Sequence, residues 1–156
     1  LYSRMFSVKA MTMILNGFKK VVRDGKENWS QYAKEFLIAS NLAGIAFGNA
    51  GCAAVHALSY PLGGAYHIPH GEANQLMFES VYNKYYEKDP NGRIQDFFEV
   101  VSEILGVGKE EALKALFALT NQILERKPLS SYGIKKEELS EFVKSVIEGQ
   151  QRLLKA

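Results

Sequence analysis

Three histidines stand close together in one short stretch of this 156-residue sequence. His56 and His70 are fourteen positions apart, and His67 lies between them. Imidazole is the usual side-chain ligand of zinc and ferrous iron in proteins. Helices that carry His56 and His70, joined by a tight turn, can bring two imidazoles together, so this spacing indicates a candidate metal site. Two histidines do not complete such a site, because a catalytic metal takes about three or four protein ligands.

Each of these residues also has a structural interpretation. A histidine on the apolar face of a helix is often a hydrogen-bonded core residue, which is the alternative for His56 and His70. His67 also fits a solvent-exposed loop. Glu72, expected in the first turn of the second helix, is explained by the helix dipole and receives no catalytic role. Asn74, whose amide can face a ligand, is left unassigned.

The elements that must position these residues are predicted to be helices. Apolar residues recur at three- and four-residue steps, and turn signals separate the runs. Pro61-Leu62-Gly63-Gly64 is expected to be a turn, and Pro69 stands where a helix carrying His70 would begin. The expected helical segments are 5–22, 32–47, 52–58, 70–81, 94–105, 110–125 and 136–154.

The same pattern favours an all-α fold. The sequence has no convincing run with the two-residue alternation of a strand, and no repeat of fixed length is evident. We therefore expect a helix bundle of about six to eight helices that forms a single helical domain over residues 1–156. Because the sequence begins with Leu1 rather than methionine, we expect this domain to be a fragment of a longer protein.

Composition narrows the class of partner. The sequence is 47% hydrophobic and 23% charged, which is typical of a globular domain and not of a disordered chain. The formal net charge is only +2 and the charges are interspersed, so we expect a small-molecule partner and neither nucleic acid nor membrane. The apolar stretch 43–62 is interrupted by polar residues and favours a buried helix over a membrane span. The single cysteine, Cys52, suits a reducing cytosol and a place in the core.

Residues 56–74, HALSYPLGGAYHIPHGEAN, are far more specific as a string than the histidines alone. This string resembles the signature of the iron-containing (group III) alcohol dehydrogenases. Its tyrosine before the proline is most similar to the NAD-dependent 4-hydroxybutyrate dehydrogenase branch of that family. Residues 42–51, LAGIAFGNAG, and 129–134, LSSYGI, resemble further segments of the family, so the resemblance spans nearly the whole chain.

The resemblance implies a two-domain enzyme, in which an N-terminal α/β domain binds NAD and a C-terminal helical domain supplies the metal. This chain corresponds to most of the helical domain. In the family an aspartate and a histidine, spaced Asp-x-x-x-His, hold the metal together with two further histidines, which correspond to His56 and His70. The Asp-x-x-x-His pair would lie upstream of Leu1. The implied metal is Fe²⁺ or Zn²⁺, since the ligand set suits both.

The resemblance also implies roles for two residues near the reacting carbon. Many members have histidine where Tyr60 stands, and that histidine approaches the nicotinamide or relays a proton. His67 corresponds to a histidine in several members and is the better candidate for such a relay. Packing is the alternative for Tyr60, and solvent exposure is the alternative for His67.

The implied reaction is the reversible reduction of succinate semialdehyde to 4-hydroxybutyrate by NADH, with a metal that polarises the aldehyde carbonyl. Reduction of another small aldehyde or ketone, such as lactaldehyde or a butanal, is the alternative within the family. A catalytically silent helical interaction domain is the alternative from another class. We expect the complete enzyme to be a cytoplasmic homo-oligomer and the isolated chain to be inactive.

Overall fold

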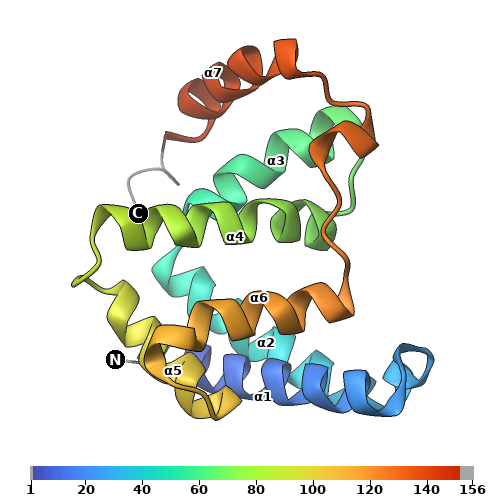
Figure 1. Ribbon diagram of the computed structural model, residues 1–156, viewed down its shortest axis with the longest axis vertical. Coiled ribbons are helices and arrows are strands. Elements are labelled where there is room, and N and C mark those ends of the chain that lie inside the picture. Colours follow the sequence, from blue (N-terminus) through green and yellow to red (C-terminus); the bar gives the residue numbers. More distant parts are fainter. Residues whose placement is uncertain (1, 152–156) are drawn as a thin grey trace. The chain divides into compact units, whose positions relative to one another are not determined.

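Helices dominate the computed structural model, which describes residues 2–151 (Figure 1). Within these residues there are seven α-helices and four short 3₁₀-helices, and no strand. The all-α prediction is therefore confirmed. The α-helices are α1 (Tyr2–Asp24), α2 (Ala33–Ala50), α3 (Ala54–Tyr66), α4 (His70–Lys88), α5 (Ile94–Leu105), α6 (Ala112–Ile123) and α7 (Leu139–Gly149). The 3₁₀-helices are Lys26–Tyr32, Lys109–Glu111, Leu129–Tyr132 and Lys136–Glu138.

The helices group into two compact units. Within the described residues, the first unit comprises 2–50 and 89–125. The other comprises 51–88 and 126–151 and is called the histidine unit here, because it contains all three histidines. The single helical domain expected over residues 1–156 stays a prediction.

In the first unit, α1 packs along α2, and α5 and α6 pack against α1. Gly17 on α1 permits the close approach of α2, because a Cβ atom at this position would lie 2.8 Å from the Phe36 ring. The Phe36 ring also contacts the Phe18 ring, with centroids 5.7 Å apart. Amphipathic helices therefore meet here through small and aromatic side chains, as their three- and four-residue periodicity predicts.

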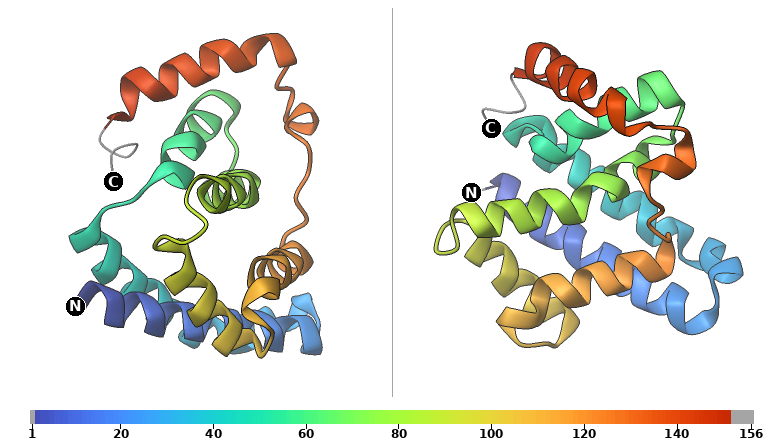
Figure 2. Two further views of the ribbon diagram at one scale, coloured as in Figure 1. Left: turned by 60° about the vertical axis from the view of Figure 1, so that its left-hand side comes forward. Right: turned by 45° about the horizontal axis from the view of Figure 1, so that its top comes forward.

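In the histidine unit, α3 packs against α4, and α7 packs against α3 (Figure 2). The core between these elements also takes in the segment after Arg126, because Ile134 is buried with residues of α3 and α4. A smaller cluster joins Ala57 on α3 to Val146 on α7. The main core consists of Leu62, Ile68, Ala73, Leu76 and Ile134.

Several helix boundaries agree closely with the sequence pattern. The segment 94–105 coincides with α5, and α4 begins at His70 as expected. The segment 136–154 begins as a 3₁₀-helix and continues as α7 to Gly149. The last residues of that predicted segment, Leu153 and Leu154, lie outside the described residues.

The turn expected at residues 61–64 is wrong. Helix α3 runs through Pro61 and ends at Tyr66, although an interior proline removes one helical hydrogen bond. Burial explains the outcome, because the helix places Leu62 at 1% exposure in the core. The chain turns instead at His67, which adopts the left-handed conformation (φ 55°) and whose N–H donates to the Leu62 carbonyl.

The apolar stretch 43–62 is divided between α2 and α3 rather than forming one helix. The break follows Ala50, and Gly51 adopts a positive φ of 82° that favours glycine. Within residues 2–151 no single helix is long and apolar enough to cross a membrane, although the segments Lys26–Ala50 and Ala54–Tyr66 pass that test together as a bent pair.

Candidate metal centre

Two of the three histidines lie side by side in the histidine unit. His56 is in the first turn of α3, and His70 is the first residue of α4. Their ring centroids are 5.4 Å apart, with the ring planes inclined by 51°. The structure therefore brings together the two imidazoles that the sequence singled out, while their binding of a metal stays a prediction.

The spacing of the two rings fits a shared metal ion. A zinc–nitrogen bond of about 2.1 Å places an imidazole centroid roughly 3.2 Å from the ion, so two rings on one tetrahedral ion have centroids roughly 5 Å apart. The observed 5.4 Å is close to that value. The donor type fits as well, because neutral imidazole suits both ferrous iron and zinc.

The protonation state of His56 also favours metal binding. Burial lowers the pKa of the His56 imidazole below its ordinary value, and the neighbouring His70 lowers that pKa further. A metal binds the neutral form of histidine, so a lowered pKa reduces the competition from protons. This environment follows from the position of His56 on a packed helix.

The ligand set is incomplete within the described residues. Among residues 2–151, no group of three or more histidine, cysteine, aspartate or glutamate side chains is arranged to hold a metal. The two imidazoles therefore form at most half of a four-ligand site. That the other two ligands lie outside this sequence, as the family resemblance implies, stays a prediction.

Tyr60 completes a cluster of three rings with His56 and His70. It lies one helical turn after His56 on α3, so both side chains leave the same face of that helix. The Tyr60 ring stacks on the His70 ring, with centroids 6.0 Å apart and planes inclined by only 19°. It meets the His56 ring edge-on, at 6.1 Å and 69°. This cluster of Tyr60, His56 and His70 is called the ring cluster below.

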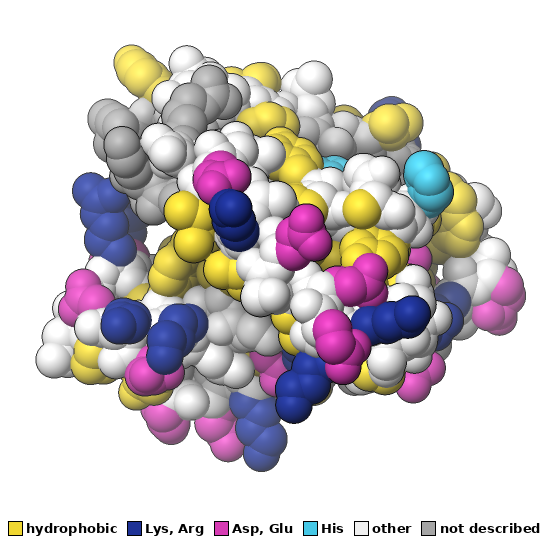
Figure 3. All heavy atoms as spheres, turned by 90° about the horizontal axis from the view of Figure 1, so that it is seen from above, with side chains coloured by type: hydrophobic (Ala, Val, Ile, Leu, Met, Phe, Trp, Pro, Cys, Tyr) yellow, Lys and Arg dark blue, Asp and Glu magenta, His cyan; other side chains and the backbone are white. Residues whose placement is uncertain are grey.

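His67 lies outside the ring cluster. It occupies the C-cap of α3 and its side chain is exposed. Among the described residues, the ring contacts of His56 and His70 are with each other and with Tyr60, and not with His67. The relay role predicted for His67 stays a prediction. Figure 3 shows histidine side chains that reach the surface beside hydrophobic ones.

Asn74 is part of the site, although sequence reasoning gave it no role. It lies one turn after His70 on α4, and its Nδ2 atom is 3.0 Å from Nε2 of His70. Its Oδ1 atom is buried, and the part of the chain that the structure describes offers it no hydrogen-bond partner. The four-residue spacing of His70 and Asn74 could have indicated this contact, because side chains four apart on a helix are neighbours.

Glu72 has a partner that the sequence could not show. The hydroxyl of Tyr132 donates to Oε1 of Glu72 at 2.6 Å, across 60 positions of sequence. This hydrogen bond is the main cause that raises the pKa of Tyr132 to about 12. The segment Leu129–Tyr132 is thereby tied to the first turn of α4, the turn that begins with His70.

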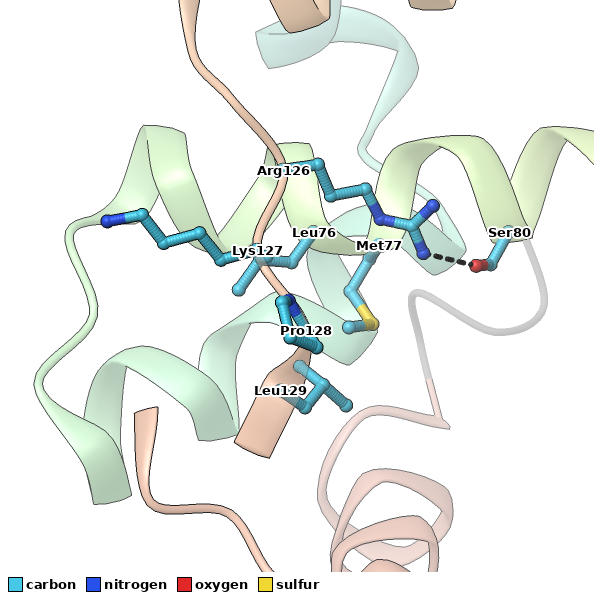
Figure 4. A pocket seen from close by; sticks show the side chains of 7 residues that line it. All are labelled: Leu76, Met77, Ser80, Arg126, Lys127, Pro128 and Leu129. Carbon is cyan, nitrogen blue, oxygen red and sulfur yellow. Dashed lines mark hydrogen bonds between the residues drawn. The ribbon is translucent and has the colours of Figure 1, made fainter. Parts of the chain in front are cut away.

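A surface pocket of about 400 Å³ lies further along α4 and is separate from the ring cluster (Figure 4). Arg126, one of two cationic side chains that line the pocket, donates to Glu79 at 2.6 Å and to Ser80 at 3.0 Å. Leu76, which lines the pocket, follows His70 by six residues, a rise of about 9 Å along the helix. The lining residues described for the pocket include none of the three histidines. Its lining residues are Leu76, Met77, Ser80, Arg126, Lys127, Pro128 and Leu129.

The chain is similar in sequence to a known protein family and to individual dehydrogenases and reductases. A family model described as "Fe-containing alcohol dehydrogenase family, C-terminal" matches residues 2–155. Over 153 residues the chain is 54% identical to 4-hydroxybutyrate dehydrogenase of Clostridium kluyveri, a match that covers 98% of this chain and 41% of that protein. Over 147 residues it is 27% identical to lactaldehyde reductase of Escherichia coli, covering 90% of this chain and 37% of that protein.

The fold has a counterpart among solved structures. The crystal structure of a 1,3-propanediol oxidoreductase matches with a TM-score of 0.77 and 25% sequence identity. The match covers 94% of this chain and 39% of the other. The present chain thus spans about two fifths of the length of the relatives that it matches.

Proposed function

Because this chain belongs to the iron-containing alcohol dehydrogenase family and matches its C-terminal region, we propose that it is the metal-binding helical domain of an NAD-dependent dehydrogenase. The observation that carries this proposal is the 5.4 Å separation of the His56 and His70 rings, a spacing that suits one shared ion. We propose further that the complete enzyme interconverts 4-hydroxybutyrate and succinate semialdehyde. The 54% identity to a protein of that name, against 27% to a lactaldehyde reductase, supports this substrate.

In this proposal His56 and His70 are two ligands of Fe²⁺ or Zn²⁺. The chemistry that such an ion supplies is Lewis-acid polarisation of a carbonyl oxygen, which favours hydride transfer from a nicotinamide. The protein contributes a half-buried imidazole of lowered pKa at His56 and an exposed imidazole at His70. His67 remains the candidate for proton relay, as an exposed residue at the turn between the two ligands.

The remainder of the active centre is proposed to come from other parts of the enzyme. NAD and the further metal ligands have no assigned residues within this chain, and the lining residues described for the α4 pocket include no member of the ring cluster. Residues 1–156 alone are therefore expected to oxidise no NADH. The proposed complete enzyme acts on a small molecule in the cytoplasm as a homo-oligomer.

The test is NADH oxidation by the complete protein under anaerobic conditions, with ferrous ion added or chelated. Succinate semialdehyde is compared with lactaldehyde and butanal at matched concentrations. We expect turnover that requires the metal and a higher kcat/KM for the carboxylated aldehyde. A preference for the neutral aldehydes would reject the substrate and keep the family. The absence of turnover with every aldehyde would reject the dehydrogenase function.

A further inference from the structure

We propose that Tyr60 is a positioning residue for His70, whose imidazole it holds in the orientation that binds the metal. The inference rests on the proposed function, in which His70 is a ligand. It assigns Tyr60 a role other than proton transfer, the role that the resemblance suggested for this position. What supports it is the way the two rings meet and how each is anchored.

Tyr60 presents the face of its ring to His70. The centroid distance of 6.0 Å and the 19° inclination describe an offset stack, an arrangement that attracts aromatic rings. The edge-on contact with His56 places the Tyr60 ring against both ligands, because the three ring centroids form a nearly equilateral triangle. Because Tyr60 touches both imidazoles, it limits the rotation of His70 relative to His56.

The backbone that carries Tyr60 is firmly held. Its neighbour Ser59 is 1% exposed and donates its hydroxyl to the His56 carbonyl, and Leu62 is 1% exposed in the core. His70, in contrast, is the first residue of its helix and has an exposed side chain. An exposed side chain loses rotamer freedom when it binds a metal, so a neighbour that orders it in advance increases affinity.

The ring of Tyr60, and not its hydroxyl, makes the contacts that matter. Within residues 2–151 the hydroxyl has no hydrogen bond, and the side chain is 43% exposed. Asn74 also touches His70, but it does so at the Nε2 atom, where it would compete with a metal for that nitrogen. Tyr60 meets the imidazole by ring stacking rather than at a nitrogen atom, which is what a positioning residue requires.

The experiment titrates the metal-free complete protein with Co²⁺ and follows binding by visible absorption. Tyr60→Leu and Tyr60→Gln remove the ring, whereas Tyr60→Phe keeps the ring and removes the hydroxyl. Loss of a stacked aromatic pair should raise the Kd for Co²⁺ roughly three- to tenfold in both ring-free variants. Tyr60→Phe should bind within about twofold of the parent protein, given the same principle.

The matched control is Tyr86→Leu, because Tyr86 lies on α4 in the same unit and is 46% exposed. This control should retain the parent Kd. The proposal would be overturned if the ring-free variants kept the parent Kd, or if Tyr60→Phe weakened binding as much as they do. A loss of turnover in Tyr60→Leu that persists at saturating metal would also overturn it, because it would indicate a chemical step. If His70→Ala leaves Co²⁺ binding intact, the proposed function fails rather than this inference alone.

Discussion

The two units of the chain end comparable helices in different ways. In the first unit, α5 ends at Gly106, which takes a left-handed conformation with φ 72°. In the histidine unit, α3 ends in the same conformation at His67, with φ 55°. Glycine adopts this conformation without steric cost because it has no Cβ atom. In histidine the Cβ atom approaches the following carbonyl oxygen, so the same conformation costs energy. Helix α5 therefore follows the local rule and helix α3 departs from it.

Other departures occur in the histidine unit as well. Pro61 lies inside α3, and Oδ1 of Asn74 is buried without a partner among the described residues. Each departure stands within a few residues of His56 or His70. Violations of local rules collect where a protein positions functional groups, because surrounding structure can compensate for them. The comparison thus supports the histidine unit as the part of the chain that carries the proposed site.

The largest effect on local stability is expected from substitutions at the two helix-ending residues, Gly106 and His67. Gly106→Ala should lower the local stability of α5 by about 1 to 2 kcal/mol, the cost of a left-handed residue with a Cβ. Nothing lies within 4 Å of that added Cβ, so the backbone conformation is the sole cause. His67→Gly should raise the stability of the α3 end by about 1 kcal/mol. Hydrogen exchange of the last-turn amides in the complete protein measures both. Stability changes of the same sign in the two variants would contradict this comparison.

A smaller effect is expected from two tyrosines that donate to carboxylates, Tyr132 to Glu72 in the histidine unit and Tyr32 to Asp24 in the first unit. Tyr132→Phe should cost about 1 kcal/mol of local stability, typical of one hydrogen bond. It should also weaken metal binding, because Glu72 belongs to the turn that begins with His70. Tyr32→Phe should leave metal binding unchanged. A metal titration of both variants checks this, and equal weakening by the two would contradict it.

The pH dependence of the Tyr132 hydrogen bond has a defined sign. Its pKa is raised from an ordinary value of 10.0 to about 12 in the folded chain. The stabilisation is therefore fully present below about pH 10 and is lost as the pH rises towards 12. The stability difference between the parent and Tyr132→Phe should be constant near neutrality and shrink in that range. A difference that grew with pH would show that the hydroxyl is not the donor.

Sequence periodicity predicted most of the helices and the meeting of two histidines. The helix predicted at 94–105 was correct because two local signals indicate the same helix: its apolar face and the glycine that ends it. The turn at 61–64 failed because proline and glycine are local signals, while the burial of Leu62 is decided by the tertiary fold. The Tyr132–Glu72 hydrogen bond and the stack of Tyr60 on His70 depend on packing between helices, which periodicity does not report.

The most direct test of the central claim is the metal content of the complete protein and of three histidine variants, measured after purification and dialysis. His56→Ala and His70→Ala each remove a ring of the ring cluster, whereas His67→Ala removes the exposed histidine at the intervening turn. We expect metal to be lost from the first two variants and retained in the third. Metal retained in His56→Ala and His70→Ala, or lost equally from all three, would contradict the assignment of these two histidines as ligands.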